Sequence, residues 1–297
     1  MMTVAVSGSA LDRIGPPASR GVCFSCDAAV GLEVAEAVAE RVSSAASWFS
    51  VGILSSDREL ARRWADFCRR RGLRPLFHPL DLDVCGTDTL DEAVLHALGE
   101  RATELGSPWL NIDLAMWVRQ GEALLESLVP MPLVDEAVDW AVERIRHAQA
   151  VIGRPITIEN APYPFVVGDT DILTLMSRIA ERADCLMTLD VGHLYGLRVQ
   201  RGQPALLPSD ADVAWDRVVE AHMSGTFTRD FPGGVKVVDD KHDWPVVDEV
   251  WELAGQLLPR APNLRSVMVE AEGMGADELA TSVLRFAAAT ERWWGAA

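Results

Sequence analysis

Histidine and carboxylate side chains recur at the ends of apolar segments in this chain. Four of its six histidines stand at or just after segments of β-type composition: His78, His193, His222 and His242. Glu159, Asp190 and Glu270 likewise end such segments. A carboxylate carried there from a buried strand is costly unless a metal ion or a cationic side chain compensates it. Scattered helix caps and ion pairs are the simpler explanation of any one residue, but their recurrence favours a metal site.

Two short spacings support the metal hypothesis. In Asp190-Val191-Gly192-His193 an acid and an imidazole flank a predicted tight turn from strand to loop, and Gly192 would permit the bend. In Asp240-Lys241-His242 the two outer side chains lie on one side of an extended segment, so both can reach a single ion. Each spacing is a weak signal by itself.

The donor set indicates which metals such a site would take. Imidazole and carboxylate without clustered thiolates suit iron, manganese or zinc. A single ion normally takes fewer protein ligands than this while keeping an open position, so we expect two or more ions bridged by a carboxylate. The candidate ligands are Glu159, Asp190, His193, His222, Asp240, His242 and Glu270.

Other catalytic designs find little support in the sequence. There is no Gly-x-Ser-x-Gly elbow for a nucleophilic serine, and Pro232-Gly233-Gly234 lacks the context of a phosphate-binding loop. Cys23 and Cys26 have the spacing of metal ligands, but a second such pair is missing, so we interpret them as buried thiols of the first strand. A redox or metal role for them is the alternative. Met116-Trp117 is interpreted as packing, with a place in a substrate groove as the alternative for Trp117.

The remaining sequence must position the site, and its pattern predicts a barrel. Short apolar runs alternate with longer helical patterns, which is typical of parallel sheets built from βαβ units. We predict strands at 20–25, 47–52, 73–78, 108–113, 155–159, 185–190, 217–223 and 266–270, and helices at 28–44, 57–71, 88–105, 133–152, 171–183, 210–216, 246–258 and 276–293. This count matches a single-domain (β/α)₈ TIM barrel over 1–297, whose active sites lie at the C-terminal strand ends. Residues 1–18 are expected to be a flexible N-terminal segment.

Composition narrows the classes of partner. The net charge is −17, from 44 acidic and 27 basic residues, so the overall field repels the phosphate backbone of nucleic acids. No run approaches the roughly 20 apolar residues of a membrane span, and the first residues lack the pattern of a signal peptide. His96 and His147 fall inside predicted helices and are interpreted as surface or packing residues. We expect a cytoplasmic protein with no membrane and no nucleic-acid partner.

Several of these segments resemble one enzyme family. The resemblance rests on Ile158-Glu159-Asn160-Ala161-Pro162-Tyr163, Leu189-Asp190-Val191, Glu220-Ala221-His222-Met223-Ser224-Gly225, Asp240-Lys241-His242-Asp243-Trp244-Pro245-Val246 and Val269-Glu270. They resemble the multinuclear non-heme iron-dependent oxidative enzymes, which include the iron enzyme of methanobactin biosynthesis, within the xylose-isomerase-like TIM-barrel superfamily. The resemblance is clearest from about 155 to 275.

The resemblance implies a TIM barrel with two or three iron ions (Fe²⁺/Fe³⁺), with Mn²⁺ or Zn²⁺ as the alternative. It also implies dioxygen as co-substrate, oxidation of a residue, most often cysteine, in a ribosomally synthesised precursor peptide, and a small partner or recognition protein that delivers the peptide. Asp190, His193 and Asp240 are expected to act in catalysis. The metal ligands that the resemblance implies are His78, Asp113, Glu159, Asp190, His193, His222, Asp240, His242 and Glu270.

Departures from the family pattern leave parts of this site open. His193 stands where many members have Asn, and Asp113 stands where a Glu-His pair is usual. The second strand, Trp48-Phe49-Ser50-Val51-Gly52, lacks the expected acidic signature, so we infer that one metal position is altered or empty. Two other functions remain: a divalent-metal-dependent sugar isomerase or epimerase of the xylose-isomerase-like type, and a non-catalytic metal-binding peptide scaffold.

Overall fold

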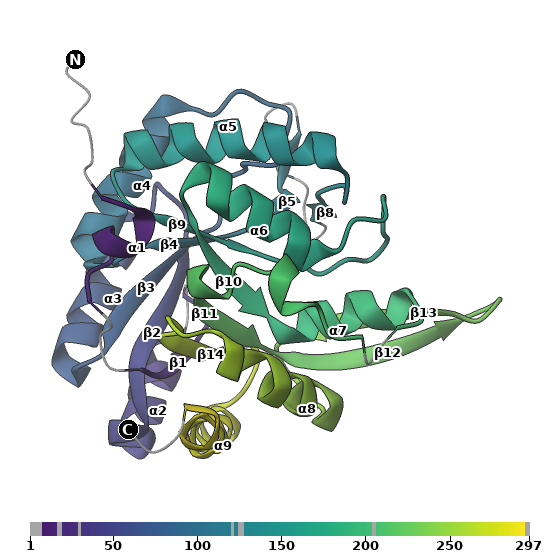
Figure 1. Cartoon of the computed structure of the whole chain (residues 1–297). Coiled ribbons are helices and arrows are strands. Elements are labelled where there is room, and N and C mark those ends of the chain that lie inside the picture. The colour runs from purple at the N-terminus through teal and green to yellow at the C-terminus, as the bar shows by residue number, and fades with distance from the viewer. Residues whose placement is uncertain are drawn as a thin grey trace.

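Eight parallel strands close into a barrel in the computed structural model, which describes residues 8–16, 20–28, 31–119, 122–123, 128–203 and 206–294. Strand β1 pairs with both β14 and β2, which closes the sheet (Figure 1). The strands in order of sequence are β1 (Gly21–Ser25), β2 (Ala46–Ile53), β3 (Arg74–Pro79), β4 (Leu110–Asp113), β9 (Ile156–Glu159), β10 (Leu186–Asp190), β11 (Val218–Met223) and β14 (Ser266–Val269). The predicted (β/α)₈ TIM barrel is confirmed.

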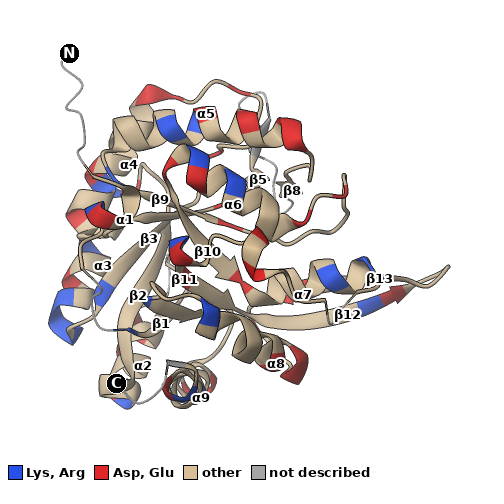
Figure 2. Cartoon of the chain, in the orientation of Figure 1, with Lys and Arg blue, Asp and Glu red and all other residues tan. Residues whose placement is uncertain are grey.

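Helices surround the barrel, and many charged residues lie on them. They are α2 (Leu32–Val42), α3 (Arg58–Arg71), α4 (Glu92–Leu105), α5 (Asp135–Ile152), α6 (Ile172–Ala183), α7 (Val191–Gln200), α8 (Asp248–Leu257) and α9 (Ala276–Trp294). Figure 2 shows acidic and basic residues interspersed along these helices. Four arginines of α3 form ion pairs with glutamates of neighbouring helices, as Arg58 does with Glu100 at 2.7 Å. No helix among the described residues is long and apolar enough to cross a membrane.

The N-terminal end of the barrel is closed by a short helix, α1 (Ala10–Arg13). Ser9 caps it, and Ala10 and Ile14 pack on a buried cluster with Trp48 and Trp109 of the barrel interior. Within the N-terminal segment 1–18 that we expected to be flexible, residues 10–13 are therefore helical and packed. Residues 1–7 and 17–19 lie outside the described residues.

The sequence prediction is wrong between β10 and β11. The helix predicted at 210–216 is two 3₁₀ turns, Asp210–Asp212 and Trp215–Arg217, and the helix after β10 is α7. Asp190 ends β10 and also caps α7, because its side chain accepts a hydrogen bond from the backbone N–H of His193. The predicted bend at Gly192 is thus a helical turn. A Cβ at Gly192 would lie 3.3 Å from Asp190 Oδ1 and 3.4 Å from Ser224 Oγ, so close approach is the reason for glycine there.

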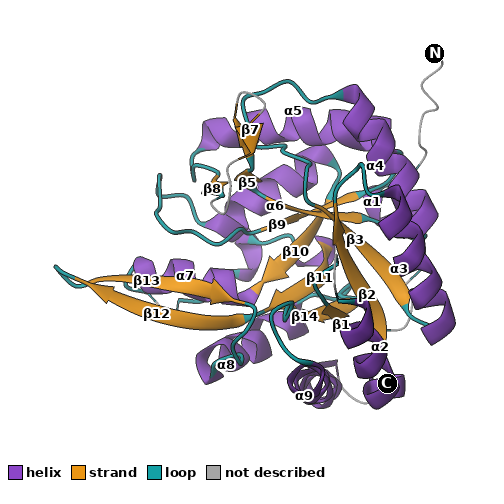
Figure 3. Ribbon diagram, turned by 180° about the vertical axis from the view of Figure 1, so that it is seen from behind, coloured by secondary structure: helices purple, strands orange, loops and turns teal. Residues whose placement is uncertain are grey.

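An antiparallel hairpin follows the seventh strand, between 223 and 246, where we predicted neither strand nor helix. It consists of β12 (Gly225–Phe231) and β13 (Val235–Lys241), and it extends away from the barrel beside α7 (Figures 1 and 3). The turn between its strands holds Gly233 and Gly234 at positive φ, +84° and +79°, which explains the glycine pair. Two small two-stranded sheets follow β4: β5 (Ala115–Met116) with β8 (Val129–Pro130), and β6 (Val118–Arg119) with β7 (Glu122–Ala123).

Candidate metal centre

The predicted ligands gather at the C-terminal mouth of the barrel around a cavity of about 570 Å³. Strands β3, β4, β9, β10 and β11 carry one each at or near their ends, and Glu270 directly follows β14. The hairpin supplies the remainder, with Asp240 on β13 and His242 just beyond it, while His193 lies in the first turn of α7. Side chains from segments that are distant in the sequence therefore meet at one place.

An inner cluster is centred on His222, which is fully buried. Its Nδ1 lies 3.0 Å from Glu159 Oε1 and 3.0 Å from Glu270 Oε1. With Asp190, these residues offer four ligand atoms that all lie within 4.8 Å of one another. Side chains of four different strands or strand ends can thus coordinate the same ion.

The charges of the inner cluster are strongly coupled. Burial alone would lower the pKa of His222, but the carboxylates of Glu159 and Glu270 raise it well above its usual range. Burial raises the pKa of Asp190 well above the usual value for an aspartate, and burial also raises that of Glu159. For Glu270, burial is outweighed by His222, and its pKa falls to about 2. His222 is therefore the group that offsets the burial of Glu159 and Glu270, whereas for Asp190 the opposing charge is His193.

An outer cluster connects the inner one to the hairpin. Asp240 Oδ2 lies 3.3 Å from His193 Nε2 and 2.8 Å from His242 Nε2. His242 Nε2 is also 3.6 Å from Glu270 Oε2, so Glu270 faces both clusters and could bridge two ions. Ser224 donates a hydrogen bond to the other oxygen of Asp240. The two imidazoles hold the pKa of Asp240 well below its usual range, although burial opposes this.

A third group lies toward β3 and β4. His78 Nε2 is 3.4 Å from Asp113 Oδ2, and Asp113, Glu159 and His193 form another set of ligand atoms within 4.8 Å of one another. The structure therefore brings Asp113 to the mouth, in contact with a histidine, and does not place it as a helix cap. Seven of the nine residues of the predicted site line the cavity, and the other two, Asp190 and His222, are buried next to them.

The donor set fits metal ions. Seven carboxyl groups and four histidines gather at or just beneath the mouth: Asp113, Glu159, Asp190, Glu220, Asp240, Glu270 and Glu272, with His78, His193, His222 and His242. When all seven carboxyl groups are ionised, even four protonated imidazoles leave three negative charges uncompensated. No Lys or Arg is among the described residues that line the cavity. Asp190 Oδ2 and Glu270 Oε2 are buried with no hydrogen-bond partner in the described structure. Divalent or trivalent cations would compensate both the charge and these oxygens.

Comparison with known proteins agrees with this centre. The sequence profile of the family described as "RiPP precursor modification enzyme MbnB/TglH/ChrH" matches residues 40–283, which include every residue of the three groups. The chain belongs to this family. The resemblance seen in the sequence is thereby confirmed.

Two curated relatives of this family member are UPF0276 proteins. A UPF0276 protein of Streptomyces avermitilis is 31% identical over 202 residues, which cover 65% of this chain and 40% of that protein. A UPF0276 protein of Pseudomonas aeruginosa is 29% identical over 213 residues, which cover 70% of this chain and 68% of that protein. The aligned part thus spans less than half of the first relative.

Solved structures similar to this family member share its barrel. A zinc-bound IOLI protein has a TM-score of 0.58 at 13% identity and covers 93% of this chain and 99% of its own. A xylose isomerase domain protein from Planctomyces limnophilus has a TM-score of 0.57 at 15% identity, with coverage of 93% and 99%. Endonuclease IV from Thermus thermophilus has a TM-score of 0.54 at 16% identity and covers 92% of this chain and 99% of its own. At such identities the likeness shows the xylose-isomerase-like fold alone.

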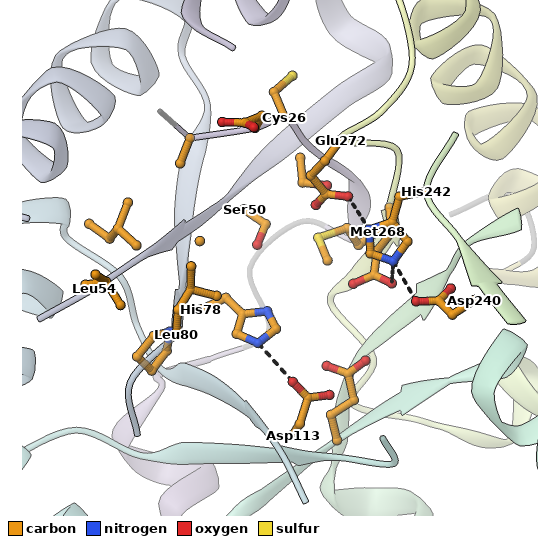
Figure 4. Close-up of a pocket in the computed structure, with 18 of the residues that line it drawn as sticks. Cys26, Ser50, Leu54, His78, Leu80, Asp113, Asp240, His242, Met268 and Glu272 are labelled. Carbon is orange, nitrogen blue, oxygen red and sulfur yellow. Dashed lines mark hydrogen bonds and ion pairs between the residues drawn. The ribbon is translucent and has the colours of Figure 1, made fainter. Parts of the chain in front are cut away.

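The opposite side of the cavity differs in chemistry from the metal side. Figure 4 shows Leu54 and Leu80 across the cavity from Asp240 and His242. These two leucines are 41% and 49% exposed, so large apolar side chains face the opening. Trp117 lines the cavity as well, which agrees with the alternative we gave for it. The mouth therefore has a charged wall and an apolar wall.

Cysteines are no part of the charged wall. Cys23 and Cys26 are both buried, as we interpreted them, and only Cys26 reaches the cavity. Burial raises the pKa of the Cys26 thiol to about 12, so it stays protonated and unreactive near neutral pH. His96 and His147 are exposed on the outer helices, where both contact Glu92, as the surface interpretation requires.

Sequence reasoning missed two carboxylates of the site. Glu220 accepts a hydrogen bond from His222 Nε2 at 3.0 Å, and Glu272 lies 2.6 Å from His242 Nδ1. Each stands two residues from a predicted ligand, Glu220 before His222 and Glu272 after Glu270. Because side chains two apart on a strand share a face, the period of two was a usable signal for Glu220.

Proposed function

We propose that this protein is an iron-dependent enzyme that uses dioxygen to oxidise a cysteine residue of a ribosomally synthesised precursor peptide. The observation that supports this proposal most is the buried inner cluster, which Glu270 connects to the outer cluster. The chain also belongs to the family described above. Two or three ions would bind at the nine predicted residues, with Mn²⁺ or Zn²⁺ as the alternative metals. Iron held there would supply electrons to dioxygen, and the peptide residue would be oxidised.

Protein groups would position the reactants and move protons. Asp190, Glu159 and His222 would hold the inner ion, and Glu270, which faces both clusters, would contribute to holding the inner and the outer ion. With two ions bound, His193 can remain free of metal, and because its Nε2 lies 3.3 Å from Asp240 Oδ2 it can exchange a proton with that carboxylate, which also contacts His242 Nε2. His242 is about one-third exposed, which connects this path to solvent. These contacts are the basis for the catalytic roles of Asp190, His193 and Asp240.

The apolar wall favours a peptide side chain over a sugar. Ile53, Leu54, Leu60 and Leu80 line this part of the cavity, and none of them offers a hydrogen bond. A sugar bound against them would lose hydrogen bonds from its hydroxyl groups to water without replacement. The absence of Lys and Arg from the described lining also disfavours phosphate-bearing substrates.

Two other functions remain as alternatives with less support. A metal-dependent sugar isomerase or epimerase rests on the shared barrel fold alone, and a non-catalytic metal-binding scaffold rests only on the ligand-rich mouth. We further propose that a small recognition protein presents the peptide, and that the reaction takes place in the cytoplasm, where buried thiols stay reduced.

Anaerobic loading with Fe²⁺ followed by addition of dioxygen separates these functions. The proposal predicts a change in optical spectrum and stoichiometric oxygen uptake by the wild-type protein, and neither in Glu270→Ala loaded in the same way. For a sugar isomerase, dioxygen would not change the activity. A non-catalytic scaffold would neither take up oxygen nor isomerise a sugar. Wild-type oxygen uptake no faster than that of free Fe²⁺ would contradict the proposal.

A further inference from the structure

Glu220 lies beneath the metal site with two hydrogen-bond donors directed at its carboxylate. It is 1% exposed and belongs to β11, two residues before His222. One oxygen, Oε1, accepts a hydrogen bond from His222 Nε2 at 3.0 Å. The other, Oε2, accepts one from the indole Nε1 of Trp109 at 2.7 Å. Two donors thus match two acceptor oxygens.

The two nitrogens of His222 face different partners. Nδ1 points to Glu159 and Glu270, which are the inner-cluster acids, and Nε2 points away from them to Glu220. An imidazole that donates Nε2–H to a carboxylate keeps its lone pair on Nδ1 when it is neutral. A carboxylate behind a metal-binding histidine in this manner fixes the ring orientation and strengthens the ligand.

We propose that Glu220 is a positioning residue: with Trp109 it holds His222 in the form that binds metal through Nδ1. Trp109 contributes because its indole N–H holds the Glu220 carboxylate in one orientation. It is fully buried and packs on Trp48, with ring centroids 5.6 Å apart, so its N–H has a fixed direction. This inference rests on the metal site of the proposed function but not on its oxidative chemistry.

Glutamine in place of Glu220 is an informative change because it has one acceptor oxygen for two donors. Its NH₂ group must face either Trp109 or His222, and facing His222 it would favour the tautomer with hydrogen on Nδ1, which cannot bind the ion. Trp109→Phe removes the competing donor, so in the double variant the oxygen of the new glutamine is free to accept from His222. Trp48→Phe is the matched control, because it removes a neighbouring buried indole whose N–H has no hydrogen-bond partner in the described structure.

Zn²⁺ titration followed by NMR tests this inference. Each protein is labelled with ¹⁵N-histidine and titrated with Zn²⁺ against a chelator, and the His222 resonances, assigned by their loss in His222→Gln, report on the inner cluster itself. We expect coordination through Nδ1 in the wild type and about 10- to 100-fold weaker Zn²⁺ binding in Glu220→Gln. Glu220→Gln/Trp109→Phe should recover to within a few-fold of Trp109→Phe, and Trp48→Phe should bind as the wild type does.

The outcomes that would overturn the inference are distinct. Coordination of His222 through Nε2, wild-type affinity in Glu220→Gln, or a double variant that binds more weakly than Glu220→Gln would each contradict it while leaving the metal site intact. If Glu220 and Trp109 had only a structural role, the double variant would bind Zn²⁺ more weakly than Glu220→Gln, because the effects of two destabilising changes would add. A wild-type protein whose His222 resonances ignore Zn²⁺ would overturn this inference and the metal site together.

Discussion

The two walls of the barrel mouth differ in almost every physical property. On the wall formed by β9, β10, β11, β14 and the hairpin, Asp190 and His222 are completely buried, and carboxylates lie beside imidazoles, as Asp190 does beside His193 and Glu159 beside His222. On the wall formed by the ends of β2 and β3, Leu54 and Leu80 line the cavity, and nearly half of each residue is exposed. His78 and Asp113 lie between the two walls.

All eight strands end at the same side of the barrel, yet the two walls have different chemistry. This difference indicates that one wall binds metal ions and the other binds substrate. Burial strengthens electrostatic interactions, so the charged wall suits tight binding of cations. Exposed apolar surface in a cavity has value only when a ligand covers it, so the apolar wall suits the substrate. Substitutions on each wall test whether the two walls act independently.

The largest effect is expected for His222→Ala. It removes the ligand at the centre of the charged wall and leaves Glu159, Glu270 and Glu220 without their imidazole partner. We expect the inner ion and all activity to be lost, and the metal-free protein to be destabilised by about 3–5 kcal/mol. Metal analysis and thermal unfolding measure the two effects. His147→Ala, which removes an exposed histidine paired with Glu92, is the control and should change neither.

Asp113→Ala is expected to lower the iron content by one equivalent, because Asp113 belongs to the group between the walls. Asp113→His should restore that equivalent, since imidazole is the donor that the family resemblance implies there. Iron content after identical loading decides the question, with Glu92→Ala as a surface control that also removes a carboxylate in contact with histidine. Undiminished iron in Asp113→Ala would make this position structural and the cluster smaller.

Metal affinity should rise with pH. Burial lowers the pKa of His78, but the Asp113 carboxylate raises it, to a net value of about 9, and His222 is shifted upward by its acids as well. A metal ion must displace these protons, so Zn²⁺ affinity should increase by about tenfold per pH unit for each proton released between pH 6.5 and 8.

Stability of the metal-free protein should change in the opposite direction over this range. A pKa raised by folding contributes stability that is complete below the unfolded value of about 6.5. For His78 this contribution is lost as the pH rises through about 9. Thermal unfolding of the metal-free protein and Zn²⁺ titration at matched pH values test both signs. Affinity that does not depend on pH would mean that the histidines of the charged wall are not ligands.

The smallest effect is expected on the apolar wall. Leu54→Ser should raise KM for the peptide about fivefold, because roughly 1 kcal/mol of apolar burial is lost on binding, and should leave metal content and kcat unchanged. Leu284→Ser changes a similarly exposed leucine on α9, outside the cavity lining, and serves as the control. A loss of iron in Leu54→Ser would show that the two walls are not independent.

The barrel itself was accessible from the sequence, because each strand is a short apolar run with helix on both sides. All eight predicted strands agree with the structure to within two residues at their ends. Helix α7 was missed because it is buried on nearly all sides between β13 and the barrel, so its sequence has no polar face to show a helical period. The hairpin was missed because β12 and β13 are mixed polar and apolar strands outside the barrel pattern.

The site was predictable to the extent that it follows from strand ends. Glu159, Asp190 and His222 end or nearly end barrel strands, so the fold alone brings them together. Which nitrogen of His222 faces the acids could not be predicted, because it depends on the layer beneath, where Trp109 and Glu220 meet from positions 111 residues apart. That Glu270 faces both clusters also required the position of the hairpin.

Metal content is the most direct test of the central claim that the charged wall binds more than one metal ion. Protein made in iron-supplemented cells and purified without chelators should contain more than one equivalent of iron per chain by elemental analysis. Glu270→Ala should lose more than one equivalent, because Glu270 lies between the inner and outer clusters. A reproducible single equivalent of zinc in the wild-type protein, with no bound iron, would contradict the account.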